Sequence, residues 1–354
     1  MDGKSLREGI YHYIKSSVQS QDEFNSLFTS LAALQRSENR LYGRYVESFG
    51  SRSISSWRDV IPVPVQFFKE FDLRSYPPGL QSEFCWESSG TTGKKSRTFL
   101  ADSHTYNLVI EKLWKENVPK FEGNTYRLIP ETSEWPHSSL AHFFTIGNST
   151  EVVAEGCFRR WTPAYDSNDE LISVFEFHEE TETPLRLCGT SYAIASVFDH
   201  MEKLNVRFQL PEGSTIMDTG GYKGIVRDRS RDEFLGQAEY NLCIPSKNCL
   251  NEYGMSELSS HFWSHWIDGE EWWSVPPWVR VRSVDPFTGE DKNEGVGVFY
   301  DLANVWSCCA IQTQDIIEIK EGGGPEYIRP KGRMKEAELK GCSITAELTL
   351  SGAE

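Results

Sequence analysis

The stretch Ser88-Ser89-Gly90-Thr91-Thr92-Gly93-Lys94-Lys95-Ser96 gathers hydroxyl, glycine and lysine side chains in one short segment. Glycines let backbone N–H groups converge on one point, and hydroxyls supply further donors around it. Apolar residues stand directly before it, at 84–86, and directly after it, at 98–100. The pattern predicts two strands joined by a glycine-rich loop that binds phosphate.

Of two other interpretations of this loop, the first does not match the sequence and the second stays open. The spacing Gly-x-x-x-x-Gly-Lys-Ser/Thr of a P-loop fails twice, because Ser88 replaces the first glycine and Lys95 the final hydroxyl. A solvated loop is the second interpretation, since clusters of Ser, Thr and Gly usually form loops without a ligand.

Length and charge limit the class of protein. The 354 residues are enough for a large core and two or three lobes. The 36 Lys and Arg against 52 Asp and Glu give a formal charge of −16, which repels nucleic acids, so no nucleic-acid partner is expected. The first residues lack a signal-peptide pattern and no apolar stretch reaches spanning length, which predicts a cytoplasmic protein with no membrane span.

The hydrophobic pattern predicts an α/β fold. Residues 1–50 show helical spacing and are expected to cover one side of the core. Predicted strands at 126–129, 185–188 and 214–218 alternate with helices, and glycines follow the last two strands. Such alternation is typical of a parallel sheet, whose ligands bind at the carboxyl ends of the strands. From Trp278 the pattern changes to strands and turns, which predicts a small β subdomain over about 270–330.

The segment Tyr253-Gly254-Met255-Ser256-Glu257 combines groups that suit a nucleotide. An aromatic ring can stack on a base, a glycine permits close approach, and a hydroxyl can contact phosphate. A carboxylate such as Glu257 can hold Mg²⁺ together with substrate phosphates. Alternatively, Glu257 is an ordinary residue in the first turn of a helix. Further along, Asp315 could accept both ribose hydroxyls at a strand edge, or serve as a turn or cap residue.

Two further motifs are incomplete. His261 and His265 could share a helical face, as in zinc peptidases, but Phe262 stands where that motif needs glutamate. Gly189 to Ala193 nearly matches the nucleophile elbow of serine hydrolases, but Ala193 replaces the final glycine. The eight cysteines show no paired zinc spacing, so most are expected to be reduced core residues.

Taken in order, these motifs resemble the adenylate-forming ligase superfamily. Ser88 to Lys94 is similar to its phosphate loop, Tyr253 to Glu257 to its second signature, Thr313-Gln314-Asp315 to its ribose-binding aspartate and Gly332-Arg333 to its hinge. The resemblance implies an adenylation domain over 1–332 and a truncated C-terminal segment over 333–354. Ordinary members carry a further domain with a lysine that bridges the substrate carboxylate and the α-phosphate, so the group that takes this role here stays open.

Within the superfamily, the chain resembles the acyl-protein synthetases of bacterial bioluminescence. The resemblance is carried by Ser96-Arg97 after the loop, by Thr219-Gly220-Gly221-Tyr222-Lys223-Gly224, and by Lys340-Gly341-Cys342-Ser343. It implies activation of a carboxylic acid, with a fatty acid as the expected substrate, and transfer of the acyl group to Cys342. It also implies a partner acyl reductase. Transfer to a separate carrier protein or coenzyme A is an alternative, as is an inactive relative that binds acyl-adenylate or a partner.

The resemblance implies ATP and Mg²⁺ as cofactors and gives each site residue a role. The phosphates are expected to be bound by Ser88, Ser89, Gly90, Thr91, Thr92 and Gly93, with Lys94 and Lys95 as catalytic cations. The nucleotide is expected to be bound by Gly220, Gly221, Tyr253, Gly254, Ser256, Asp315 and Arg333. Glu257 is expected to bind Mg²⁺, and Cys342 is expected to accept the acyl group.

Overall fold

The computed structural model describes residues 2–50, 53–77, 79–88, 94–149, 168–220, 229–320 and 326–334. The chain divides into two compact units. Unit 1 consists of Met1–Lys112, Met255–Phe262 and Glu271–Glu354, and unit 2 of Leu113–Gly254 and Trp263–Glu270. The predicted adenylation domain over 1–332 takes in most of both units, and its boundaries stay a prediction.

Unit 2 contains the predicted parallel sheet. Its strands β4 (Asn124–Leu128), β5 (Leu185–Thr190), β6 (Thr215–Thr219) and β7 (Cys249–Tyr253) pair in parallel in chain order. Strand β8 (Phe262–Ile267) lies beside β7. The register places Thr190, Thr219 and Glu252 side by side, so the carboxyl ends of β5, β6 and β7 are level. The three strands predicted here are confirmed, whereas β7 and β8 had not been predicted.

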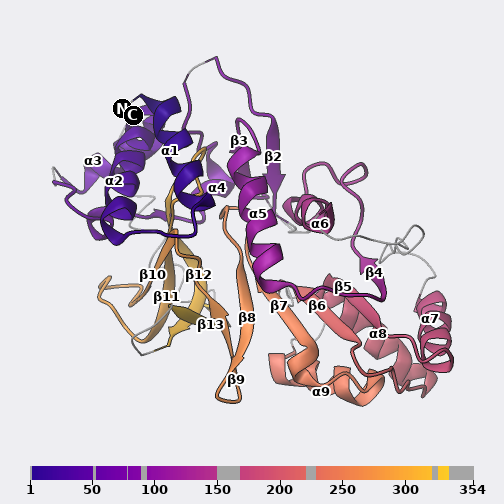
Figure 1. Ribbon diagram of the computed structural model, residues 1–354. Helices are drawn as coiled ribbons and strands as arrows, with labels where there is room; N and C mark the ends of the chain where they lie inside the picture. Colours follow the sequence, from indigo (N-terminus) through magenta and orange to yellow (C-terminus); the bar gives the residue numbers. More distant parts are fainter. Residues whose placement is uncertain are drawn as a thin grey trace. The chain divides into compact units, whose positions relative to one another are not determined.

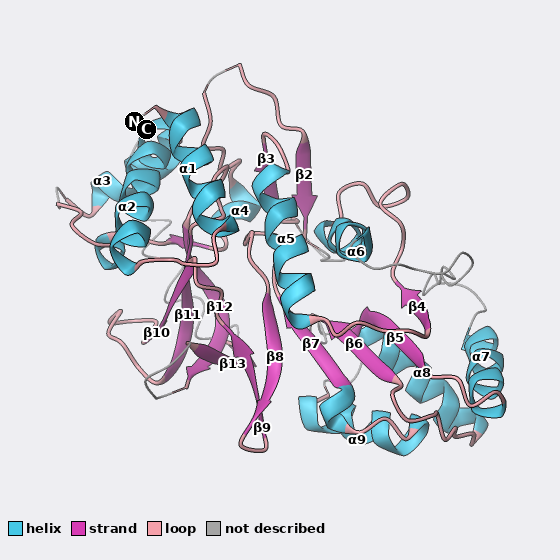
Figure 2. Ribbon diagram, in the orientation of Figure 1, coloured by secondary structure: helices cyan, strands magenta, loops and turns pink. Residues whose placement is uncertain are grey.

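Helices of unit 2 cover this sheet, as Figures 1 and 2 show for α8 and α9 below β5 to β7. The helices are α6 (Ser139–Ser149), α7 (Asn168–Glu180), α8 (Ser191–Leu204), α9 (Arg231–Leu242) and the 3₁₀ turn η2 (Ser246–Asn248). Phe175, Phe198 and Phe234 from α7, α8 and α9 form a core with Leu187 and Ile216 of the strands. Both faces of β5 are buried, as expected for a parallel strand between helices.

Unit 1 begins with three helices, within the range 1–50 that the sequence predicts to be helical. They are α1 (Gly3–Lys15), α2 (Gln21–Glu38) and α3 (Arg40–Ser48), and Asp2, Ser20 and Asn39 cap their N-termini with side-chain oxygens. Such caps satisfy the backbone N–H groups that a first helical turn leaves unbonded. The elements that follow are η1 (Trp57–Asp59), β1 (Val63–Pro64) and α4 (Phe67–Glu70), and α5 (His104–Asn117) leads along the chain into unit 2.

The region of the predicted β subdomain, about 270–330, contains antiparallel strands, and its bounds as a subdomain stay a prediction. Its strands are β9 (Glu270–Ser274), β10 (Val279–Val284), β11 (Glu294–Asp301), β12 (Ala310–Ile319) and β13 (Tyr327–Arg333). They run in the order β10-β11-β12-β13-β9, and β1 pairs in parallel with β12. Gly332 and Arg333, the predicted hinge, are the last two residues of β13. Gly332 has φ of +114°, a conformation that glycine adopts most readily.

The predicted strand–loop–strand around the glycine-rich stretch is also confirmed. Strand β2 (Phe84–Glu87) pairs antiparallel with β3 (Arg97–Leu100) as a separate two-stranded sheet. Phe84 lies opposite Leu100, and Glu87 lies opposite Arg97. The hairpin therefore brings both ends of the loop together.

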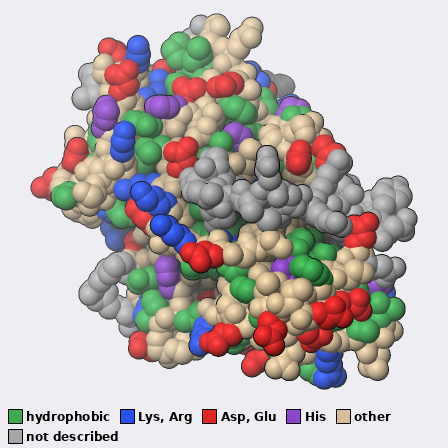
Figure 3. Space-filling view, turned by 45° about the vertical axis from the view of Figure 1, so that its right-hand side comes forward, with side chains coloured by type: hydrophobic (Ala, Val, Ile, Leu, Met, Phe, Trp, Pro, Cys, Tyr) green, Lys and Arg blue, Asp and Glu red, His purple; other side chains and the backbone are tan. Residues whose placement is uncertain are grey.

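The surface carries the charge that the composition requires. Asp and Glu side chains outnumber Lys and Arg on the face drawn in Figure 3. Among the helices that the structure describes, none combines the length and the apolar character needed to cross a bilayer.

Candidate active site

The two ends of the glycine-rich loop are joined by hydrogen bonds between Ser88 and Ser96. The Ser88 N–H donates to the Ser96 carbonyl at 3.0 Å, and the Ser96 N–H donates to Ser88 Oγ at 3.1 Å. The predicted phosphate ligands Ser89, Gly90, Thr91, Thr92 and Gly93 lie outside the described residues. The described ends fix where the loop starts and where it returns.

Ser96 links this loop to Glu257. Its hydroxyl donates to Glu257 Oε1 at 2.5 Å, and the Ser256 hydroxyl donates to Oε2 at 3.1 Å. The Glu257 residue is only 7% exposed and lies in a turn in which the Leu258 N–H donates to the Met255 carbonyl at 3.1 Å. Glu257 is therefore not in the first turn of a helix, and that alternative is wrong. Two segments 161 residues apart in sequence meet here.

The oxygens around Glu257 fit Mg²⁺. Mg²⁺ prefers carboxylate and hydroxyl oxygens, and proteins commonly bind it through one or two carboxylates plus substrate phosphates. Glu257, Ser96 and Ser256 supply one carboxylate and two hydroxyls. In the part of the chain that the structure describes, no cluster of three or more His, Cys, Asp or Glu side chains could hold a metal. The chemistry of this donor set suits an ion shared with phosphate groups.

The two lysines of the loop are exposed and paired. Lys94 Nζ lies 2.9 Å from a carboxylate oxygen of Glu70 in α4, and Lys95 Nζ lies 3.1 Å from one of Glu87 in β2. Exposed ion pairs contribute only about 0–1 kcal/mol, so these ammonium groups can exchange partners at small cost.

Asp315 and Arg333 are brought together by the β12–β13 pairing. They lie opposite each other in the register, and Arg333 Nε donates to Asp315 Oδ1 at 2.9 Å. Asp315 is buried at a strand position, so it is neither a turn nor a cap residue. Two residues predicted to share one ligand therefore lie in direct contact.

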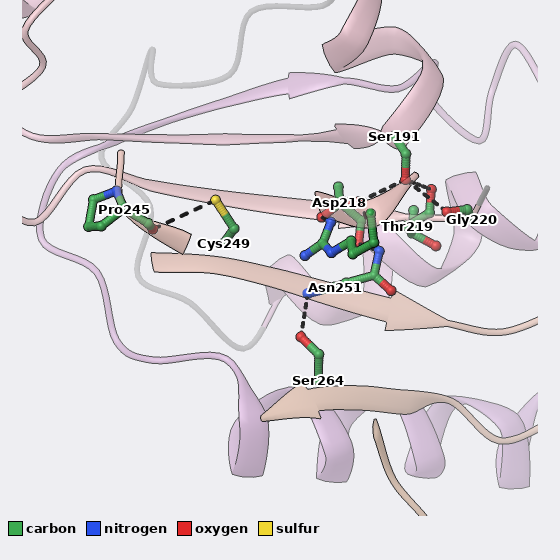
Figure 4. A network of polar contacts seen from close by, with 9 residues as sticks. Ser191, Asp218, Thr219, Gly220, Pro245, Cys249, Asn251 and Ser264 are labelled. Atoms are coloured by element: carbon green, nitrogen blue, oxygen red, sulfur yellow. Dashed lines mark hydrogen bonds and ion pairs between the residues drawn. The ribbon is translucent and has the colours of Figure 1, made fainter. Parts of the chain in front are cut away.

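In unit 2, Asp218 forms the centre of a buried polar cluster (Figure 4). Its Oδ2 accepts from the Ser191 hydroxyl at 2.7 Å and from Asn251 Nδ2 at 2.8 Å, and its Oδ1 accepts from Arg231 at 2.8 Å. Asp218 is 0% exposed. A buried carboxylate is tolerated only when it is paired and hydrogen-bonded, and each oxygen here meets that condition. The cluster ties the carboxyl ends of β6 and β7 to the start of α8 and α9.

The same cluster fixes the backbone of Gly220. Its carbonyl lies 2.8 Å from Ser191 Oγ and shares the one hydroxyl proton with Asp218 Oδ2, and its N–H donates to the Glu252 carbonyl at 3.4 Å (Figure 4 shows the contact from Ser191). Beside it, the Thr219 hydroxyl donates to the Glu252 carboxylate. Gly220 has φ of +73°, which explains the need for glycine at this position. Gly221 lies outside the described residues.

Two further residues that are predicted to contact the nucleotide, Tyr253 and Gly254, lie next to each other at the end of β7. Tyr253 ends β7 and is half-buried, and Gly254 follows it as the last residue of the first segment of unit 2. Their contact with a base stays a prediction. Sequence reasoning missed Asp218, Arg231 and Asn251, although an acidic residue directly after the apolar pair Ile216-Met217 was a usable signal.

Two alternative sites are wrong. Ser191 begins α8 and donates its hydroxyl to Asp218, so it is a buried structural residue and not an exposed nucleophile. His265 lies in β8, and His261 is the residue directly before that strand. The two histidines therefore do not share a helical face. In an extended segment, residues four apart are separated by about 13 Å, too far for one zinc ion.

Most described cysteines are unsuited to accept an acyl group. Cys188, Cys249, Cys308 and Cys309 are buried, and burial raises the thiol pKa of Cys308 and Cys309. Among the cysteines that the structure describes, Cys243 is the exposed one. Cys342 lies outside the described residues.

Comparisons with solved structures define the fold class. An open 2-hydroxyisobutyryl-CoA ligase in complex with 2-HIB-AMP and CoA matches with a TM-score of 0.61 and 12% identity, covering 89% of this chain and 76% of that chain. The A-PCP portion of McyG, complexed with phenylalanyl-adenylate, matches with a TM-score of 0.50 and 14% identity over 73% of this chain and 42% of that chain. No family model matches. The chain has the fold of the adenylate-forming ligases, as predicted.

A particular relative appears among curated proteins. The chain is similar to the long-chain-fatty-acid–luciferin-component ligase of Vibrio harveyi, with 27% identity over 175 residues. The match covers 45% of this chain and 43% of that protein, so it spans less than half of the relative's length. This match agrees with the resemblance to the acyl-protein synthetases of bacterial bioluminescence that the sequence motifs indicate.

Proposed function

We propose that the chain activates a carboxylic acid with ATP as an acyl-adenylate and then transfers the acyl group to a thiol. One observation carries the first step: Ser96, at the end of the glycine-rich loop, contacts the carboxylate of Glu257. That contact joins the predicted phosphate site to the predicted metal ligand. The Asp315–Arg333 pair adds a group suited to ribose.

In the first step, a carboxylate oxygen attacks the α-phosphorus of ATP. The new bond joins that oxygen to phosphorus, the bond to the bridging oxygen breaks, and pyrophosphate leaves. The protein's work is to position the reactants and neutralise charge. N–H and hydroxyl groups of the loop would bind the β- and γ-phosphates. Lys94 and Lys95 would add positive charge after leaving their exposed carboxylate partners.

Each remaining residue of the proposed site has a separate task. Glu257 would hold Mg²⁺, which when bound neutralises phosphate charge. Asp315 would accept hydrogen bonds from the ribose hydroxyls, and Arg333 would orient its carboxylate. Tyr253 would lie against adenine. The fixed turn at Gly220 would leave room for nucleotide and acyl chain.

In the second step, a thiolate attacks the acyl carbonyl and AMP leaves. We assign the acceptor to Cys342, because Lys340 lies two residues before it and a nearby cation favours the thiolate. Burial raises the thiol pKa of Cys308 and Cys309, so these two would remain protonated. A fatty acid is the first substrate to test, given the name of the curated relative, and an acyl reductase is the proposed partner.

The thiol step predicts a covalent acyl group on Cys342. Wild-type protein incubated with Mg·ATP and a long-chain fatty acid should gain the mass of one acyl group, and hydroxylamine should remove it. Cys342→Ser should release pyrophosphate but gain no acyl mass. Intact-mass spectrometry measures both species.

The exposed Cys243 provides the matched control. Cys243→Ser should acylate as wild type does. A Cys342→Ser protein that still carries a hydroxylamine-sensitive acyl group would contradict the assignment. One that acylates coenzyme A or a carrier protein at the wild-type rate would show that the acceptor is a separate molecule.

A further inference from the structure

Gln35 of helix α2 is buried against the segment between β11 and β12. Its Nε2 donates to the Asn304 carbonyl at 2.8 Å, and its Oε1 accepts from the Cys309 N–H at 2.8 Å. Gln35 is 0% exposed. Since a buried amide that loses a partner is costly, this side chain fixes residues 304–309 relative to α2.

The Asn304 side chain passes this constraint to Glu257. Its Nδ2 donates to the Glu257 carbonyl and to the Cys308 carbonyl, each at 2.8 Å. Asn304 is itself 2% exposed. An Asn amide has two N–H donors, and both are used here. The backbone at Glu257 is thus bonded to a residue that α2 holds in place.

Asp301 fixes the residues that follow. Its Oδ2 accepts from the N–H groups of Ser259 and Ser260 at 3.0 and 2.8 Å, and its Oδ1 accepts from the Ser260 hydroxyl at 2.7 Å. The Ala303 N–H donates to the same Oδ1 at 3.0 Å. Residues 257–260 therefore have little freedom to move away from residues 301–304.

We propose that Gln35 and Asn304 are positioning residues that hold the Glu257 carboxylate where Ser96 meets it. The proposal rests on the proposed function, because it takes Glu257 as the Mg²⁺ ligand. All the residues of this relay belong to unit 1. Helix α2 then contributes to the site itself, beyond covering the core.

The first test compares Gln35→Leu with Leu31→Ala. Leu31 is one turn earlier in α2 and equally buried, so Leu31→Ala destabilises the helix packing while leaving the relay intact. Gln35→Leu should raise the Mg²⁺ concentration for half-maximal pyrophosphate release about tenfold, with the KM for the carboxylic acid unchanged. Leu31→Ala should leave both values unchanged. An equal Mg²⁺ requirement in the two variants would overturn the proposal.

A second test needs no enzyme activity. In urea unfolding, Ser96→Ala removes the hydroxyl that binds Glu257. If Gln35 positions Glu257, Ser96→Ala should cost less stability in the Gln35→Leu background than in wild type. Additive losses would overturn the relay. Non-additive losses in a protein that releases no pyrophosphate would keep the relay and reject the proposed function.

Discussion

Replacing Glu257 by Gln is expected to lower carboxylate-dependent pyrophosphate release by about 100-fold or more. The amide keeps the volume of the side chain and an oxygen that can accept from Ser96, but it removes the negative charge that would hold Mg²⁺. The fold should therefore survive, as thermal unfolding followed by circular dichroism can verify. Pyrophosphate release is measured at saturating ATP over a series of Mg²⁺ concentrations.

Glu318→Gln is the matched control for this substitution. Glu318 lies in β12 and pairs with Lys331 at 2.9 Å and with Arg329 at 3.6 Å. Its loss of charge should leave the rate within about twofold of wild type, in keeping with the small contribution of such pairs. A Glu257→Gln protein that retains a comparable rate would remove Glu257 from the site.

Replacing Asp315 by Ala is expected to raise the KM for ATP by about 100-fold. A hydrogen bond to a charged group contributes about 1.5–3 kcal/mol, and the carboxylate would accept two from ribose. Wild-type protein should also discriminate strongly between ATP and 2′,3′-dideoxy-ATP, whereas Asp315→Ala should treat them nearly alike. Steady-state kinetics with both nucleotides measures the effect.

Asp291→Asn controls for removal of a carboxylate from an ion pair in the same unit. Asp291 is exposed and pairs with the half-buried Arg282 at 2.6 Å and with the exposed Arg58 at 3.3 Å. Its replacement should leave the KM for ATP unchanged. If Asp315→Ala still prefers ATP over the dideoxynucleotide as wild type does, the ribose must be bound elsewhere.

The fold could be predicted where local pattern and burial agree. Apolar runs followed by glycine, as at 185–189, are buried on both faces and lie in the parallel sheet. Strands β7 and β8 were missed because polar residues interrupt their apolar pattern. Asn251 and Ser264 bond to each other across these strands, and Asn251 also bonds to Asp218. Such a pattern is explained only by partners that lie far away in sequence.

The candidate site likewise contains residues that the sequence predicts and residues that it does not. The loop, Glu257 and Asp315 belong to short motifs, and their predicted roles come from the resemblance of these motifs, taken in order, to the adenylate-forming ligases. Gln35 and Asn304 gave no local signal, since Gln35 meets its two partners across 269 and 274 residues of sequence. Sequence patterns predict which groups face a ligand more readily than which buried amides hold those groups in place.

The measurement that tests the central claim most directly is carboxylate-dependent pyrophosphate release from Mg·ATP. Folded wild-type protein should be assayed with fatty acids of several lengths, and with aryl and amino acids. The account predicts release that requires the acid, with a fatty acid as the best substrate. Absence of release with every acid, from protein shown to be folded, would contradict adenylation by this chain.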